Sequence, residues 1–321
     1  MRAAHTLMTV VSLALLSGAG VARADQPTWA TKIGPASGSE SAVGAFTSGT
    51  DIYTAGNAGG GGWVARHNKD GVQQWRTSLA GSGPVSAIGF INQFGPVVVG
   101  YDSTSGVARG WVRHLDMMGR ELWKKDIGLA QVYPTAAAAG ESAWYTYVVG
   151  YGLGLVGDAQ LGGGDGWIAK YDGSGNLIWA RQIGGSENDR ALAVAYDDAT
   201  GALYVAGSTK GLDTVLIGGS WVWPLAAWVM KFDKNGNFQW KQTVDTPGQE
   251  EVTAVAATSS GVYVAGWTNT AIERTNQGNN DVWAAYYTAT GARQWLHQYG
   301  TAYSETVTDA TVDASRNVYL G

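Results

Sequence analysis

The sequence predicts an all-β protein, a β-propeller of four-stranded antiparallel blades, and three observations support this fold class. First, two tryptophans stand twelve residues apart in five places, each time with a glycine eight residues after the first. Second, the chain is rich in glycine, tryptophan and tyrosine (47, 15 and 15 residues) and shows no convincing helical apolar stripe. Third, the unit recurs at 46 to 61 residues, a period typical of solenoids and propellers.

Five copies share this tryptophan–glycine–tryptophan frame, and we expect all of these residues to have a structural role. They are Trp63, Gly71 and Trp75; Trp111, Gly119 and Trp123; Trp167, Gly175 and Trp179; Trp228, Gly236 and Trp240; and Trp283, Gly291 and Trp295. Aromatic residues at fixed blade positions mostly pack between blades, where each buries a large apolar area.

Each repeat is expected to contain four short strands separated by turn signals. In the clearest copy the predicted strands and turns are residues 191–198, 201–209, 226–236 and 237–245. The D-x-x-G-N sequence between the third and fourth strands predicts a tight hairpin, since Gly and Asn accept a positive φ. Most of the length variation falls in the connection from the second to the third strand, which is therefore expected to be a surface loop.

The ends of the repeats predict how the ring closes. The repeats span about residues 35–79, 80–128, 129–184, 185–245 and 246–300, with a partial repeat at 301–321. Residues 27–34 resemble a fourth strand that has no blade before it. Because propellers often close by pairing terminal strands in one blade, we expect residues 27–34 to complete the blade begun by 306–321. The expectation is five complete blades plus an incomplete, composite sixth, in a fragment of a six- to seven-bladed propeller.

One stretch carries a resemblance to a known family. Residues 165–179 (DGWIAKYDGSGNLIW) match the pattern D-x-[WF]-[VI]-x-K-Y-D-x-x-G-x-x-x-W nearly throughout. This pattern is similar to the SBBP repeats of exported bacterial proteins, which are named for a seven-bladed β-propeller. The resemblance covers about residues 27–321 and implies the fold; it implies no common reaction.

The first 24 residues resemble a secretory signal peptide, with Arg2, an apolar run at residues 7–16 and the sequence Ala22-Arg23-Ala24. Cleavage after Ala24 would make the protein secreted, periplasmic or attached to the cell surface. The mature chain, with 19 bases and 26 acids, would carry a net charge of −7, which argues against nucleic acid as a partner. No stretch approaches the roughly 20 apolar residues of a membrane helix, so no membrane insertion is expected.

Two groups of residues are candidates for ligand binding. Trp221 and Trp223 are out of phase with the repeat and lie in the longest insertion, with Trp267 in the next unit. They could bind a ligand or simply pack the loop against the blade.

The second group is a set of acids near the start of the first strands, at the mouth of the predicted central channel: Glu40, Asp189, Glu250 and Glu305. They could bind Ca²⁺ through several oxygen ligands. The favoured alternative is that they cap backbone N–H groups or pair with neighbouring blades. No other cofactor is predicted, and no metal site is assigned.

Catalytic signals are weak. His67, His114 and His297 lie in three different units without a repeated partner, and no nucleophile or zinc motif occurs. We therefore expect a monomeric, non-catalytic binding or scaffold module that recognises a polysaccharide or a surface protein. The predicted binding face carries the fourth-to-first and second-to-third connections. One alternative is a hydrolase or lyase that uses the acid ring, and another is a rigid spacer in a larger surface protein.

Overall fold

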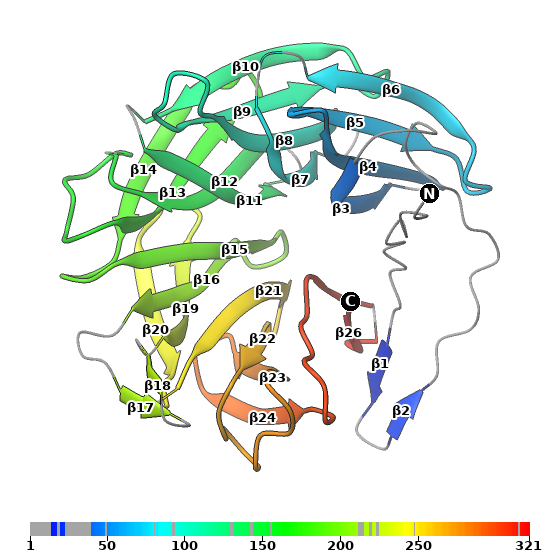
Figure 1. Ribbon diagram of the computed structural model, residues 1–321. Coiled ribbons are helices and arrows are strands. Elements are labelled where there is room, and N and C mark those ends of the chain that lie inside the picture. Colours follow the sequence, from blue (N-terminus) through cyan, green and yellow to red (C-terminus); the bar gives the residue numbers. More distant parts are fainter. Residues whose placement is uncertain are drawn as a thin grey trace, which may run out of the picture.

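The computed structural model is a ring of six four-stranded antiparallel sheets that follow one another around a common centre (Figure 1). It describes residues 14–17, 20–22, 40–48, 50–79, 81, 83–91, 94–128, 131–141, 144–154, 156–210, 215–217, 220–222, 225–246, 248–313 and 315–321. The predicted all-β propeller fold is confirmed. We name the sheets blades I to VI in the chain order of β3, β7, β11, β15, β21 and β25, the strand at one edge of each sheet.

The strands of the blades have the following bounds. Blade I contains β3 (Glu40–Ser48), β4 (Asp51–Ala58), β5 (Gly61–His67) and β6 (Gln73–Leu79). Blade II contains β7 (Val85–Ile91), β8 (Gly95–Asp102), β9 (Arg109–Leu115) and β10 (Glu121–Ile127). Blade III contains β11 (Val132–Gly140), β12 (Tyr145–Gly152), β13 (Asp165–Asp172) and β14 (Leu177–Ile183).

Blade IV contains β15 (Asp189–Asp197), β16 (Ala202–Lys210), β19 (Leu225–Asp233) and β20 (Phe238–Val244). Blade V contains β21 (Glu250–Thr258), β22 (Gly261–Thr268), β23 (Asp281–Thr288) and β24 (Arg293–Tyr299). Blade VI contains β25 (Ala310–Val312), β26 (Val318–Leu320), β1 (Ala14–Ser17) and β2 (Gly20–Ala22). The loop of blade IV adds a small hairpin of β17 (Val215–Ile217) and β18 (Ser220–Val222).

The third-strand tryptophans form the interior of the blades. All are at most 2% exposed: Trp63, Trp111, Trp167, Trp228 and Trp283. In blades I to IV a glycine on the paired second strand lies directly against the indole, where a Cβ would come within 2.4 to 2.7 Å of the ring. These glycines are Gly56, Gly100, Gly150 and Gly207. The glycine that ends the second-strand motif is therefore required by the tryptophan beside it.

The fourth-strand tryptophans of blades I to IV join each of these blades to the next. Each of these four indoles donates a hydrogen bond from Nε1 to a backbone carbonyl in the β-turn of the following blade. The pairs are Trp75 to Met117 (2.9 Å), Trp123 to Gly173 (2.9 Å), Trp179 to Lys234 (3.3 Å) and Trp240 to Ala289 (3.1 Å).

The same indoles lie against the turn glycine of that blade, so that a Cβ on the glycine would be 2.7 to 3.1 Å from the ring. These are Gly119, Gly175, Gly236 and Gly291, with φ between +78° and +88°. We call each hydrogen bond and ring contact together an inter-blade latch.

Blade VI is completed from the N-terminal part of the chain. β1 pairs antiparallel with β26, with Leu15 opposite Tyr319, and β2 pairs with β1. Figure 1 shows these strands beside the C-terminus. The sequence analysis assigns the closing strand to residues 27–34, which lie outside the described residues. β1 and β2 come from the segment expected to be a signal peptide, and a chain cut after Ala24 would lack both.

The chain carries no helix among its described residues that is long and apolar enough to cross a membrane.

The latch predicts a stability difference between two glycines with the same backbone conformation. Gly119 and Gly106 both have a φ of +79°, but a Cβ on Gly119 would lie 2.7 Å from Trp75, whereas a Cβ on Gly106 would meet nothing within 4 Å. Gly106→Ala should lower the free energy of unfolding by about 1 kcal/mol, the cost of a left-handed alanine. Gly119→Ala should lower it by about 3 kcal/mol, because the indole must also move. Denaturant unfolding of both variants measures this difference, and equal losses would contradict the latch.

Candidate functional site

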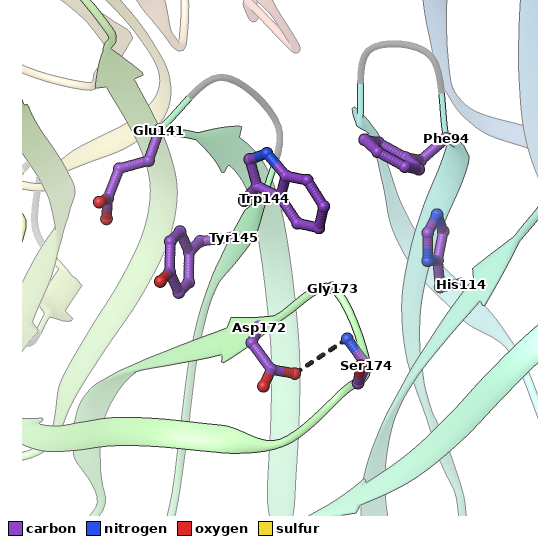
Figure 2. Close-up of a pocket in the computed structure, with 8 residues that line it drawn as sticks. All are labelled: Phe94, His114, Glu141, Trp144, Tyr145, Asp172, Gly173 and Ser174. Atoms are coloured by element: carbon purple, nitrogen blue, oxygen red, sulfur yellow. Dashed lines mark hydrogen bonds between the residues drawn. The ribbon is translucent and has the colours of Figure 1, made fainter.

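A pocket of about 450 Å³ opens between blades II and III, a volume within the range of small-ligand sites (Figure 2). Its wall is built from three hairpin turns and from residues of β9, β12 and β13. The lining residues are Phe94, His114, Glu141, Trp144, Tyr145, Asp172, Gly173 and Ser174. The turns join first to second strands and third to fourth strands. The pocket therefore lies on the face opposite to the one that the sequence analysis favours for binding.

Two exposed aromatic side chains flank the mouth of the pocket. Trp144, which precedes β12, is 61% exposed, and Phe94, which precedes β8, is 39% exposed. Their ring centroids are 5.4 Å apart at an interplanar angle of 52°, so the two blades are linked through these rings. An exposed indole costs solvation free energy, and its position beside a pocket provides an apolar surface for a ligand.

Glu141 closes one side of the pocket and is held by a network within blade III. It has a φ of +54° and accepts hydrogen bonds from the Tyr147 hydroxyl (2.9 Å) and from the ammonium of Lys170. Lys170 also lies 4.0 Å from the ring centroid of Tyr145. Because Lys170 is 5% exposed, this pair is an internal ion pair, and the Glu141 charge is largely compensated.

Asp172 forms the other acidic wall and caps its own hairpin turn. Its carboxylate accepts hydrogen bonds from the backbone N–H of Ser174 (2.9 Å) and of Asn176 (2.8 Å), and from the Asn176 side chain (2.9 Å). Desolvation would raise the pKa of Asp172, but these hydrogen bonds outweigh it and hold the pKa below its usual value. Asp172 therefore carries a full negative charge at neutral pH.

His114 forms the buried end of the pocket. It is 2% exposed, packs edge-on against Trp123 with centroids 5.5 Å apart, and neither ring nitrogen has a hydrogen-bond partner among the described residues. Burial lowers the pKa of His114; the backbone of Phe94, which lies near the ring without the geometry of a hydrogen bond, and the charge of Asp116 partly oppose this decrease. The imidazole is therefore neutral at pH 7, and one of its nitrogens is a free acceptor.

The pocket exists because blade II has smaller residues at two positions of the repeat. On β8 and β9, Val97 is paired with His114. At the corresponding pairs, blades I, III and IV have a tyrosine opposite an arginine or lysine: Tyr53 with Arg66, Tyr147 with Lys170, and Tyr204 with Lys231. This departure of blade II from the other copies of the frame is present in the sequence and is the signal that points to the pocket.

The four predicted acids are separated in space, and each accepts hydrogen bonds close by. Glu40 forms a two-pronged ion pair with Arg76 of its own blade, at 2.9 and 3.2 Å. Asp189, Glu250 and Glu305 each accept a backbone N–H from the residue four positions earlier, at 2.8, 3.2 and 3.1 Å. Asp189 and Glu250 are 3% and 0% exposed. Three of the acids cap backbone N–H groups and Glu40 forms an ion pair, which is the structural role given above as the alternative to ligand binding.

The geometry of the predicted acids gives little support to a Ca²⁺ site. Within the part of the chain that the structure describes, no group of three or more His, Cys, Asp or Glu side chains is placed to hold a metal ion. The D-x-S/N-x-N segments at Asp172 and Asp233 form hairpin turns, in which the aspartate accepts hydrogen bonds from its own turn.

Of the three predicted tryptophans, the structure describes the side chain of Trp267 alone, and it does not line the pocket. Trp221 is in β18, opposite Leu216, and its side chain is not described; Trp223 lies outside the described residues. Trp267 is half-buried on β22 and is paired with Glu251. Burial raises the pKa of Glu251, while Arg190 and a hydrogen bond from Trp267 oppose the increase.

A run of ring contacts extends along the face that the sequence analysis favours. Tyr101 and Tyr133 have centroids 5.2 Å apart, Tyr133 and Tyr151 are stacked at 5.3 Å, and the guanidinium of Arg190 lies 4.9 Å from the Tyr151 ring. These contacts join blades II, III and IV and stabilise their arrangement.

The comparisons with known proteins agree with the fold. No protein-family model matches the chain, so the similarity to SBBP repeats stays a prediction. Over 163 residues the chain is 27% identical to the regulatory protein FlaEY of Caulobacter vibrioides. The aligned segment covers 46% of this chain but only 17% of the length of FlaEY.

Solved structures that are similar to the chain at low identity include the following two. The WD40 domain of Neurospora crassa Pan2 has a TM-score of 0.53 at 8% identity, covering 84% of this chain and 68% of that one. A chain of a mitotic checkpoint complex has a TM-score of 0.50 at 11% identity, covering 88% and 74%. WD40 domains are propellers, so these similarities show the propeller fold alone.

The acid at the start of β13 predicts a pH dependence of stability. Asp165 is fully buried, and its Oδ1 has no hydrogen-bond partner among the described residues. Burial raises the pKa of Asp165 despite the N–H of Leu161, and the charge of Asp189 adds to the increase. Because the folded-state pKa lies above the unfolded one, ionisation costs stability as the pH rises through this interval. Asp165→Asn cannot ionise, so its free energy of unfolding should rise relative to the wild type by about 1 kcal/mol between pH 3 and neutral pH.

Asp281→Asn is the matched control for this experiment. Asp281 holds the same position in blade V and is equally buried, but it accepts hydrogen bonds from the Gln298 side chain (2.8 Å) and the Gln277 N–H (3.1 Å). An amide would place a donor against these donors, so Asp281→Asn should be less stable than the wild type at neutral pH. Denaturant unfolding at several pH values measures both. A loss of stability in Asp165→Asn that equals the loss in Asp281→Asn would contradict the prediction.

Proposed function

We propose that the chain is an exported, non-catalytic binding module that recognises a surface protein through the pocket between blades II and III. The exposed Trp144, held against Phe94 at the mouth of the pocket, is the observation that carries this proposal. Exposed aromatic side chains beside a cavity are typical anchors for a partner, because they bury a large apolar area on binding.

The shape of the pocket favours a protein over a polysaccharide. It is a single cavity with one pair of exposed rings, which suits the insertion of one side chain. A polysaccharide would need several stacking positions in a row, and the stacked tyrosines on the opposite face are engaged with one another. A polysaccharide remains the second candidate, since an indole also stacks on sugar rings.

The interpretation as a hydrolase or lyase has less support. An acid–base pair needs carboxyl groups that reach a substrate, whereas Asp189 and Glu250 are buried and accept hydrogen bonds from their own loops. The partial similarity to a regulatory protein also fits a binding role better than a reaction. Export rests on the N-terminal sequence and is part of the proposal.

Removing the exposed indole should abolish most of the binding. The full-length chain would be screened against a peptide library and an oligosaccharide library, and the strongest peptide would then be titrated by calorimetry. Trp144→Ala should weaken that peptide by about tenfold or more, which is typical of an interface anchor. Tyr303→Ala is the control, because Tyr303 is 80% exposed and does not line the pocket.

The other outcomes of the screen distinguish the alternatives. Binding of oligosaccharides without peptides would support the polysaccharide, and cleavage of a library member would support the enzyme. Peptide binding that Trp144→Ala and Tyr303→Ala leave unchanged would contradict the assignment of the pocket.

A further inference from the structure

The pocket lies at a position that other blades fill with an internal cation. The third residue after the third-strand tryptophan is Arg66 in blade I, Lys170 in blade III and Lys231 in blade IV. Each donates a hydrogen bond to the turn carbonyl that also accepts the latch tryptophan. The bonds are Arg66 to Met117 (3.3 Å), Lys170 to Lys234 (3.2 Å) and Lys231 to Ala289 (2.9 Å).

These cations share the same surroundings. Each lies over the ring of the tyrosine paired with it, at 5.9 Å from Tyr53, 5.5 Å from Tyr147 and 5.9 Å from Tyr204. Arg66 and Lys170 also contact a carboxylate from the turn between the first and second strands, Asp51 and Glu141 respectively. A turn carbonyl, an aromatic ring and, in two blades, an acid thus form a cation-binding arrangement that recurs between blades.

Blade II keeps the turn carbonyl of this arrangement, but it lacks the cation, and Val97 stands in place of the paired tyrosine. The Gly173 carbonyl accepts the indole of Trp123, and no cationic side chain among the described residues donates to it. His114 stands at the position of the cation and makes no hydrogen bond to the Gly173 carbonyl, which leaves the unprotonated ring nitrogen as a free acceptor. Around the opening lie the ionised Asp172 and the aromatic pair of Trp144 and Phe94.

We propose that this pocket receives a cationic side chain, a lysine or arginine, of the partner protein. The ammonium or guanidinium would donate to the carbonyl of Gly173 and to the unprotonated nitrogen of His114. Trp144 and Phe94 would cover the aliphatic part of the side chain, as aromatic residues do for lysine and arginine stems. The acidic chain, with a net charge of −5, attracts such a partner. This inference rests on the proposed binding function and names the group that is recognised.

The charged groups around His114 are compatible with a bound cation. Asp116 and Asp172 are half-buried carboxylates near it; Asp116 is paired with Arg120, and Glu141 is compensated by Lys170. The low pKa of His114 keeps the ring neutral at pH 7, so that it does not repel a cation. The internal cations of blades I and III lie in their own joints and leave this position free.

The test uses a peptide with one central lysine and the same peptide with that lysine Nε-acetylated, titrated into the full-length chain and followed by calorimetry. The lysine peptide should bind about tenfold or more tightly than the acetylated one, because a partly desolvated cation loses its ring and carbonyl contacts when it is neutralised. His114→Lys should abolish binding of the lysine peptide, since it supplies the cation that blades I, III and IV carry. The same variant should raise the Tm by about 2 °C through a new hydrogen bond to Gly173.

His114→Leu provides a second variant that removes the acceptor nitrogen without adding a charge. It should keep the fold, since no hydrogen bond is lost, and bind the two peptides with nearly equal affinity. Equal affinity of both peptides for the wild type would overturn the proposal that the pocket receives a cationic side chain. If Trp144→Ala still weakened the binding of both peptides, the proposed binding function would stand. Undiminished binding of the lysine peptide to His114→Lys would place the site elsewhere and also overturn the inference. If neither peptide binds and an oligosaccharide binds through Trp144, the partner is a polysaccharide, and both the protein partner and the cationic side chain are ruled out.

Discussion

The ring depends on the contact between the fourth-strand tryptophan of one blade and the turn glycine of the next. Backbone hydrogen bonds hold the strands within each sheet, but side chains must join one sheet to another. The indole of Trp123 supplies both packing and a directed N–H bond to Gly173, and so fixes the distance and the angle between two blades. The turn must have a glycine at Gly175, because its φ is +78° and a Cβ would meet the indole. Insertions between the second and third strands lie far from this contact, which explains how the repeats can vary in length.

Much of the fold follows from the sequence because the latch is periodic. The spacing of Trp228, Gly236 and Trp240 predicts a third strand, a hairpin and a fourth strand, and β19 and β20 occupy this place. The sequence does not show that Trp240 contacts the next blade at Ala289, 49 residues away, rather than its own. A fixed spacing within one repeat is compatible with either contact, and only the arrangement of the ring selects one.

Other features could not be predicted for the same physical reason. The pairing of β1 with β26 joins the two ends of the chain, and the apolar pattern of residues 7–16 fits a signal peptide as well as a strand. The acids at Asp189 and Glu250 have the composition of a polar site, but only the loop conformation shows that their oxygens accept nearby N–H and hydroxyl groups. The pocket requires the turn at Glu141, whose φ of +54° is not encoded by a glycine. The sequence does contain a departure from the repeat at Val97 and His114, and the candidate site lies beside these two residues.

The central claim is that one recurring joint holds the blades together and that the pocket is this joint without its cation and without its paired tyrosine. The crystal structure of His114→Lys tests it most directly. The account predicts that the new ammonium lies about 3 Å from the carbonyl oxygen of Gly173, with the indole of Trp123 still bonded to the same carbonyl and the pocket filled. A lysine side chain directed into solvent, with the pocket open as before, would contradict the account.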